Sequence, residues 1–149
     1  MASRVCLWGL VLLGWAFSSG QSVSSPSSIS FKVIVNQANN VEFLSKAEVS
    51  RLFLKKTLRW EAGGRVEPID QSAASSVRVS FSSEVHGRSV DAVRAYWRKL
   101  LFKGKIAPPP TRATDSEILD FVANNANAIG YVSGDAAIGA GTRVLTILE

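Results

Sequence analysis

A serine-rich segment offers the clearest ligand chemistry in this 149-residue sequence. Residues 70–76 read Asp-Gln-Ser-Ala-Ala-Ser-Ser, follow a predicted strand and end at a helix start if residues 77–85 are helical. Free backbone amides and hydroxyls at a helix N-terminus can bind an anion, and an arginine one turn into the helix would add a charged fork. The alternative is that the serines only cap the helix and face water. The candidate oxyanion site consists of Asp70, Ser72, Ser75, Ser76 and Arg78.

Residues that could support catalysis or bind a metal are few. His86 is the only histidine and lies in a polar run, residues 84–88. No nucleophile is recognisable beside it, so we interpret it as a solvated loop histidine rather than a catalytic base. Cys6 is the only cysteine and falls within the signal peptide predicted below, so the mature chain has no thiol for a disulfide or a metal. We expect no enzyme activity, no metal and no cofactor.

The aromatic and basic residues do not form a nucleic-acid pattern. Trp97 lies on the apolar face of a predicted helix and Trp60 beside a glycine turn, so we place both in or over the core. The basic residues are not interleaved with exposed aromatic residues, and we expect no nucleic-acid partner. The formal charge is +5, and loss of Arg4 with the signal leaves +4, which attracts anionic partners. The positive charge is therefore consistent with a surface that faces acidic material of the cell envelope.

The elements that must position the site begin near Phe31. Residues 31–36 are short and β-branched and predict a first strand. Ser45 and Glu48 have the spacing of a capping box and start a helix, because each side chain can satisfy a free amide of the other residue. The Gly63-Gly64 pair predicts a turn into a second strand over residues 66–69.

The second half of the chain continues the alternation of strands and helices. From Ser75 to Phe81 the apolar residues fit either a strand or a helix, and periodicity alone does not decide. Strands that alternate with helices predict an α/β sheet with helical cover. The remaining predicted elements are a helix over 89–102, a brief strand over 105–107, a proline connector over 108–110, a helix from the Thr114–Glu117 capping box to about 124–125, and strands over 128–132 and 144–148.

The N-terminus has the pattern of a secretory signal peptide. Arg4 precedes an apolar run without charge, residues 5–17, and small residues precede a cleavage site between Gly20 and Gln21. The run is shorter than the roughly 20 apolar residues of a membrane-spanning helix. We therefore expect a signal peptide over 1–20, a flexible serine-rich leader over 21–30, one domain over 31–149, and no integral membrane segment after cleavage.

Several segments together resemble the phosphate ABC transporter substrate-binding proteins. The likeness covers about residues 31–132, and it depends on order and spacing more than on any one piece. The run Ala-Ile-Gly-Tyr-Val at 128–132, after a predicted helix, is its most characteristic part. The other matching residues are Leu52-Phe53, Lys55, Trp60, Gly64, Val66-Glu67-Pro68-Ile69-Asp70-Gln71, Phe81, Tyr96-Trp97, Phe102-Lys103-Gly104 and Pro109.

The resemblance implies a type 2 periplasmic-binding-protein-like fold in a bacterial envelope, with a central mixed sheet flanked by helices. It also implies that residues 75–81 are helical. Full members of the family have two lobes that close over phosphate, whereas this chain has material for a single lobe. Family members that hold phosphate carry an Arg-x-Asp-Gly-Ser-Gly-Thr turn. The matching residues here, 68–74, read Pro-Ile-Asp-Gln-Ser-Ala-Ala and keep only the aspartate, Asp70, and the serine, Ser72.

Two functions follow from these observations. The first is a periplasmic or secreted solute-binding domain that holds phosphate or a similar oxyanion at the candidate site. In one form of this hypothesis, the anion lies between two copies of the chain. The second is a ligand-free interaction domain that contacts another envelope protein. The missing arginine and the missing lobe favour the second, and the serine cluster at a helix start favours the first.

Overall fold

The computed structural model describes residues 30–149. The predicted signal peptide and all of the predicted leader except Ser30 lie outside the described residues. The central sheet has four strands in the order β3-β6-β1-β7. In it, β1 (Phe31–Asn36) pairs antiparallel with β6 (Ala128–Ser133) and with β7 (Thr142–Val144), while β3 (Glu67–Pro68) runs parallel to β6. The sheet is therefore mixed, as the sequence predicts.

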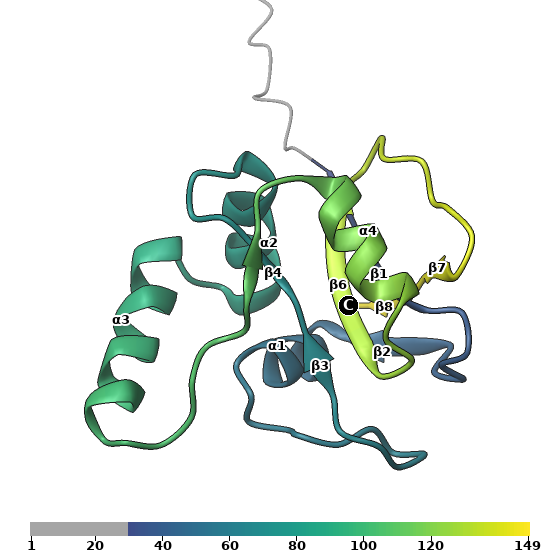
Figure 1. The fold of residues 1–149 in the computed structure, drawn as a ribbon. Coiled ribbons are helices and arrows are strands. Elements are labelled where there is room, and N and C mark those ends of the chain that lie inside the picture. Colours follow the sequence, from purple (N-terminus) through teal and green to yellow (C-terminus); the bar gives the residue numbers. More distant parts are fainter. Residues whose placement is uncertain (1–29) are drawn as a thin grey trace, which may run out of the picture.

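The two faces of this sheet bury different sets of side chains. Val33 and Val35 of β1 belong to one apolar cluster, together with Phe53 and Phe81 from the helices α1 (Lys46–Phe53) and α2 (Ser76–His86). Ile34, between the two valines, belongs to the opposite cluster, where α4 (Asp115–Ala123) covers the sheet. This alternation follows from the two-residue period of a strand. Figure 1 shows α4 on one side of β1 and β6, with α1 and α2 on the other.

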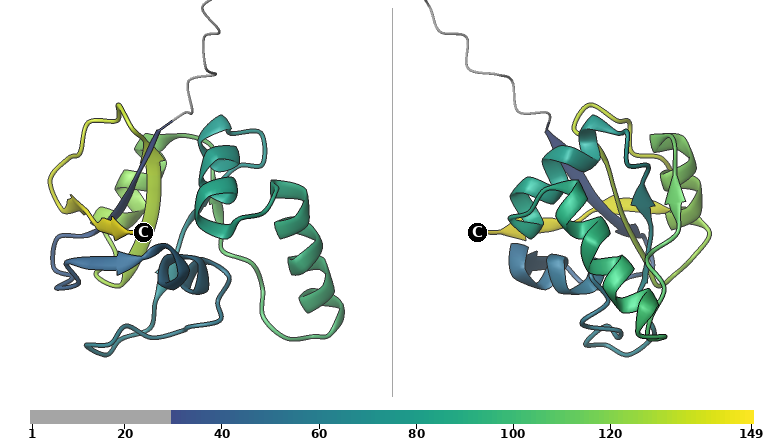
Figure 2. Two further views of the ribbon diagram at one scale, coloured as in Figure 1. Left: turned by 180° about the vertical axis from the view of Figure 1, so that it is seen from behind. Right: turned by 90° about the vertical axis from the view of Figure 1, so that its left-hand side faces the viewer.

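Side-chain caps start the helices at the residues that the sequence indicates. Ser45 and Glu48 form the predicted capping box of α1, and Thr114 and Glu117 form that of α4. Ser75 caps α2, so the ambiguous segment 75–81 is helical, as the family resemblance implies. The fourth helix, α3 (Val90–Phe102), is capped by Ser89 and packs beside α2 at the edge of the molecule (Figure 2).

Gly130 lets α4 lie close against the sheet. A Cβ atom at this position would lie 2.8 Å from Ile69 and 2.9 Å from Ile118, both of which are fully buried. Only a residue without a side chain allows this approach. The glycine of the Ala-Ile-Gly-Tyr-Val run therefore has a packing role.

Two short strand pairs complete the fold and correct three predictions. The predicted strand over 66–69 is shorter than expected, since only β3 is a strand within it. After Ile69, whose amide donates to the Ile129 carbonyl of β6, the chain leaves β6 and forms β4 (Asp70–Gln71), which pairs with β5 (Thr111–Arg112). The predicted strand over 105–107 is wrong, since pairing begins only after the prolines. The predicted final strand is split at the buried Leu145. Its first part belongs to β7, and its second part, β8 (Thr146–Leu148), pairs with β2 (Phe43–Ser45).

Candidate functional site

The five residues of the candidate site lie around the turn from β4 to α2. Asp70 and Arg78 are buried, Ser72 and Ser75 are half-buried, and Ser76 is exposed. Backbone hydrogen bonds hold the turn, because the Ser72 amide donates to the Arg112 carbonyl and the Ser75 amide to the Ser72 carbonyl. The structure thus brings the predicted residues together, although they do not all face the same way.

Arg78 turns inward rather than toward the helix start. Its Nη2 atom lies 2.9 Å from Oδ2 of Asp70, and its Nη1 donates to the Gln71 carbonyl at 2.7 Å. The side chains of Arg78 and Asp70 are only 8% and 13% exposed, so this ion pair is shielded from water. The guanidinium is therefore committed to internal partners and is not the free fork at the helix start that the sequence suggests.

Asp70 is surrounded by donors. The hydroxyl of Tyr131 donates to its carboxylate, and the Gln71 amide donates to the same carboxylate at 2.8 Å. Burial raises the pKa of Asp70 above its ordinary value, although the cation of Arg78 and these two donors act in the opposite direction. Burial and the nearby Asp70 charge also raise the pKa of Tyr131. Tyr131 is in addition stacked on Phe81, with ring centroids 3.9 Å apart.

Gln71 links this pair to the start of α4. Its Nε2 donates to the Asp115 carboxylate at 2.8 Å and to the Tyr131 carbonyl at 3.1 Å. Asp115 also accepts from the amide and hydroxyl of Ser133. The starts of α2 and α4 are therefore joined by a buried polar network in which each described side chain has a partner.

The part of the site that stays open to solvent is small and polar. The hydroxyl of Ser75 already has partners within the protein, because it donates to the Gln71 side chain and accepts from the Arg78 amide. Ser76 and the neighbouring Ala73 and Ala74 are exposed, and Ser72 is half-exposed. Hydroxyl groups and the first amides of α2 are the donors that an anion would meet here.

Sequence reasoning did not single out Gln71, Tyr131 or Asp115 as partners of the predicted residues. A weak signal existed for the tyrosine, which is part of the Ala-Ile-Gly-Tyr-Val run. No local pattern connects it to Asp70, which lies 61 residues earlier in the chain. Their contact depends on the register of β6 in the sheet.

His86 corrects another prediction, because it is neither in a loop nor fully solvated. It is the last residue of α2, it is half-buried, and its Nδ1 lies 2.8 Å from the hydroxyl of Ser50. Burial and the nearby cations of Arg78, Arg88 and Lys56 lower its pKa to about 4. A serine beside an imidazole has the arrangement of a nucleophile and its base, but an imidazole with this pKa is a weak base.

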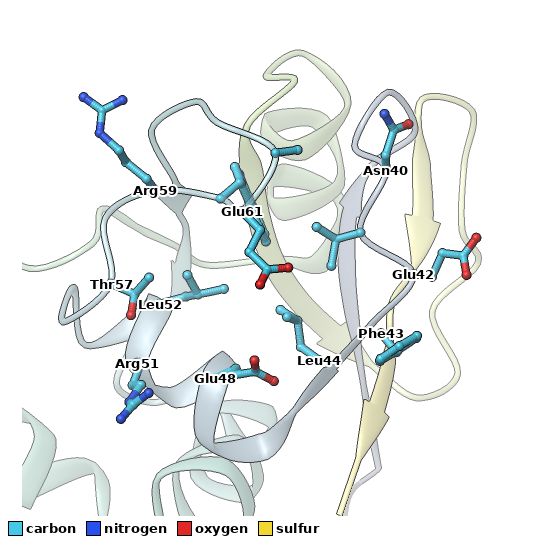
Figure 3. Close-up of a pocket in the computed structure, with 13 residues that line it drawn as sticks. Asn40, Glu42, Phe43, Leu44, Glu48, Arg51, Leu52, Thr57, Arg59 and Glu61 are labelled. Atoms are coloured by element: carbon cyan, nitrogen blue, oxygen red, sulfur yellow. The ribbon is translucent and has the colours of Figure 1, made fainter.

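The two best-formed pockets lie away from the predicted site. The larger, of about 780 Å³, lies between β2, α1 and the loop over 57–62 (Figure 3). The carboxylates of Glu48 and Glu61 face its interior, while Arg51 and Arg59 point outward (Figure 3). Glu48 is engaged in the capping box, and the hydrogen bonds that it accepts from Ser45 lower its pKa. The second, of about 310 Å³, lies beside Leu52, Lys55 and Phe121.

Two further features concern metals and membranes. Within residues 30–149, no three His, Cys, Asp or Glu side chains are grouped so that they could hold a metal ion. Among the helices of this same part of the chain, none combines the length and the apolar character needed to cross a bilayer.

Solved structures of phosphate-binding proteins share this fold. An ABC-type phosphate transport receptor from Vibrio cholerae matches with a TM-score of 0.63, at 16% identity over 80% of this chain and 46% of its own. A phosphate ABC transporter substrate-binding protein from Clostridium perfringens, solved with bound phosphate, matches with a TM-score of 0.63 and 17% identity, over 80% of this chain and 45% of its own. PstS from Borrelia burgdorferi matches with a TM-score of 0.55 and 12% identity, over 80% of this chain and 47% of its own.

These likenesses are structural, since a scan against protein-family models and a search of the curated proteins gave no match. The chain spans about half the length of the solved structures that it matches. The similarity confirms the predicted architecture, a mixed sheet flanked by helices. The described part of this chain therefore has the fold of one portion of a phosphate ABC transporter substrate-binding protein.

Proposed function

We propose that this chain is a solute-binding domain that holds phosphate or a similar oxyanion at the start of α2. The observation that carries the proposal is the shared fold with phosphate receptors, one of which was solved with bound phosphate. The anion would be held by the hydroxyls of Ser72 and Ser76 and by the first free amides of α2. Asp70 would not repel it strongly, because Arg78 neutralises that carboxylate.

A second copy of the chain would complete the site. The chain spans about half of the receptors that it matches, and the site at the start of α2 is exposed at Ser76, so a second copy would supply a facing surface. The N-terminus of a helix at a surface contributes only roughly 0.3–1 kcal/mol toward an anion. A single open site therefore binds weakly, and closure between two copies would strengthen the binding.

Calorimetric titration of the mature chain, residues 21–149, with phosphate in a chloride buffer tests this proposal. We expect measurable heat that is lost in the S72A/S76A variant and kept in the control S83A, which removes an exposed hydroxyl further along α2. The fold tolerates these changes because the Ser72 backbone hydrogen bonds remain. Absence of heat at millimolar phosphate, with a monomer in sedimentation, would exclude the proposal.

The alternative, a ligand-free interaction domain that contacts another envelope protein, is favoured by two observations. Pro68 stands where the phosphate-holding turn has arginine, and Arg78 is engaged with Asp70 and Gln71 instead of facing a ligand. Pull-down from a bacterial envelope extract with the mature chain as bait tests this function. Recovery of no protein, together with a positive phosphate titration, would count against it.

We further propose that the chain is exported and that residues 1–20 are removed as a signal peptide. The support is the charged start, the apolar run and the small residues before Gln21. Expression of the full chain in a bacterium, followed by mass spectrometry of the periplasmic fraction, gives the N-terminus directly. A product that begins at Gln21 is expected, and a product that keeps Met1 in the membrane fraction would contradict cleavage.

A further inference from the structure

The C-terminal end of α3 forms a projecting corner of the molecule. The helix is attached along one face only, where Val93 and Trp97 are buried against Leu54. Its last turn extends away from the central sheet, and the following loop returns toward β5 (Figures 1 and 2). Side chains of that last turn therefore lie beyond the packed part of the domain.

This corner carries exposed apolar side chains. Phe102 is 91% exposed and Leu101 is 52% exposed. The helix ends in a well-defined turn, because the Gly104 amide donates to the Leu101 carbonyl and the Lys105 amide to the Leu100 carbonyl. The exposure of Phe102 is thus a property of an ordered helix end. Two adjacent exposed apolar side chains at an ordered helix end can serve as an interaction surface.

The charged residues of the segment that carries Leu101 and Phe102 have one sign. Between Asp91 and Asp115 there is no carboxylate, whereas the segment holds Arg94, Arg98, Lys99, Lys103, Lys105 and Arg112. Asp91 lies at the opposite end of the helix, where it pairs with Arg94.

We propose that this corner, the α3 tip formed by residues 98–105, binds the surface of an anionic phospholipid bilayer. Phe102 and Leu101 enter the boundary between headgroups and acyl chains, and the surrounding cations contact the acidic headgroups. The convex shape favours a bilayer over a folded partner, because a rigid protein would need a matching hollow whereas lipids rearrange around a projecting side chain. The residues of the α3 tip are separate from Ser72 and Ser76, so the inference goes beyond the proposed oxyanion site and does not depend on it.

Vesicle co-sedimentation of the mature chain in phosphate-free buffer tests the proposal. We expect binding to vesicles of equal parts phosphatidylglycerol and phosphatidylcholine, and none to pure phosphatidylcholine. Phe102→Ser should weaken binding about tenfold or more, because it removes a large buried apolar side chain from the bound state. The control Val79→Ser removes another exposed apolar side chain, 55% exposed on α2 and away from the α3 tip, and it should leave binding unchanged.

A second pair of variants separates the α3 tip from general attraction by a basic protein. K103Q/K105Q should weaken binding about thirtyfold, at about 1 kcal/mol for each cation near the surface. The comparison variant K32Q/K46Q removes the same formal charge from β1 and the start of α1, where Lys32 donates to the Ala136 carbonyl and Lys46 pairs with Glu149, and should have a much smaller effect. In Phe102→Trp, emission should shift to the blue when anionic vesicles are added.

Three results would overturn the proposal. They are absence of binding to the anionic vesicles at low salt, unchanged binding by Phe102→Ser, and equal losses in K103Q/K105Q and K32Q/K46Q. Because Phe102, Lys103 and Lys105 are exposed, these variants should fold like the wild type, and far-ultraviolet circular dichroism verifies this.

Discussion

Replacing Arg78 with methionine would remove the cation that faces the buried carboxylate of Asp70. Methionine keeps most of the length and the apolar stem of the side chain, so the main change is electrostatic. In the variant, the Asp70 carboxylate keeps its hydrogen bonds from Tyr131 and Gln71 but loses its charge partner. A charge that is buried without a partner is strongly unfavourable in a folded protein.

The size of the effect follows from the burial of the pair. The two side chains are 8% and 13% exposed and 2.9 Å apart, and removal of one partner from such a pair costs about 3–5 kcal/mol. The free energy of unfolding of native domains is about 5–15 kcal/mol, so R78M should still fold, with much reduced stability. The double variant D70N/R78M leaves no buried charge and should be more stable than R78M alone.

Urea unfolding of the mature chain, followed by the fluorescence of the buried Trp60 and Trp97, measures these differences. Arg94→Met is the matched control, because Arg94 also lies near a carboxylate, Asp91, but their side chains are 61% and 89% exposed. Its free energy of unfolding should change by less than about 1 kcal/mol. Arg78→Lys keeps the charge but not the planar fork, so its free energy of unfolding should lie between those of wild type and R78M. This variant provides the comparison if R78M does not fold.

The pH dependence provides a second test of the same reasoning. Burial raises the folded-state pKa of Asp70 above its unfolded value, so protonated Asp70 favours folding and this contribution is lost as the pH rises through the folded-state pKa. Loss of Arg78 raises that pKa further, because its cation lowers the pKa in the wild type. R78M should therefore recover part of its stability as the pH falls through the raised pKa of Asp70. This account would be refuted if the free energy of unfolding of R78M lay within about 1 kcal/mol of the wild-type value. It would also be refuted if the stability of R78M had the same pH dependence as that of the wild type.

Two further predictions concern a glycine turn and the histidine. Gly64→Ala should destabilise the domain more than Gly63→Ala, as measured by urea unfolding. Both glycines have positive φ, but only the Cβ at position 64 would meet Asn127, at 2.6 Å from its Oδ1; equal effects would contradict this. His86 should titrate with a midpoint of about 4 in an NMR pH series, because burial and neighbouring cations disfavour its charged form. Its contribution to stability is present above the unfolded-state value of 6.5 and is lost as the pH falls toward 4, and a midpoint near 6.5 would show that the ring is solvated.

The comparison between sequence and structure is clearest at the helix starts. Ser45 with Glu48 and Thr114 with Glu117 cap their helices as predicted, because each box is a contact between residues three apart in the chain. The first strand and the strand after α4 also match, since a run of β-branched and apolar residues favours a buried strand. The short pairings of β4 with β5 and of β2 with β8 were not predicted, because two or three residues carry no periodic pattern.

By itself, the sequence determined where α1 and α4 begin, where the strands β1 and β6 lie along the chain, and which serines gather between residues 72 and 76. Only the tertiary structure decided what the charged residues of that cluster contact. Asp70 meets Tyr131 across 61 residues, and His86 meets Ser50 across 36. Such contacts depend on strand register and helix packing, which place distant side chains together without any local signal in the chain. The turn of Arg78 toward Asp70 is likewise set by the path of the chain between β4 and α2.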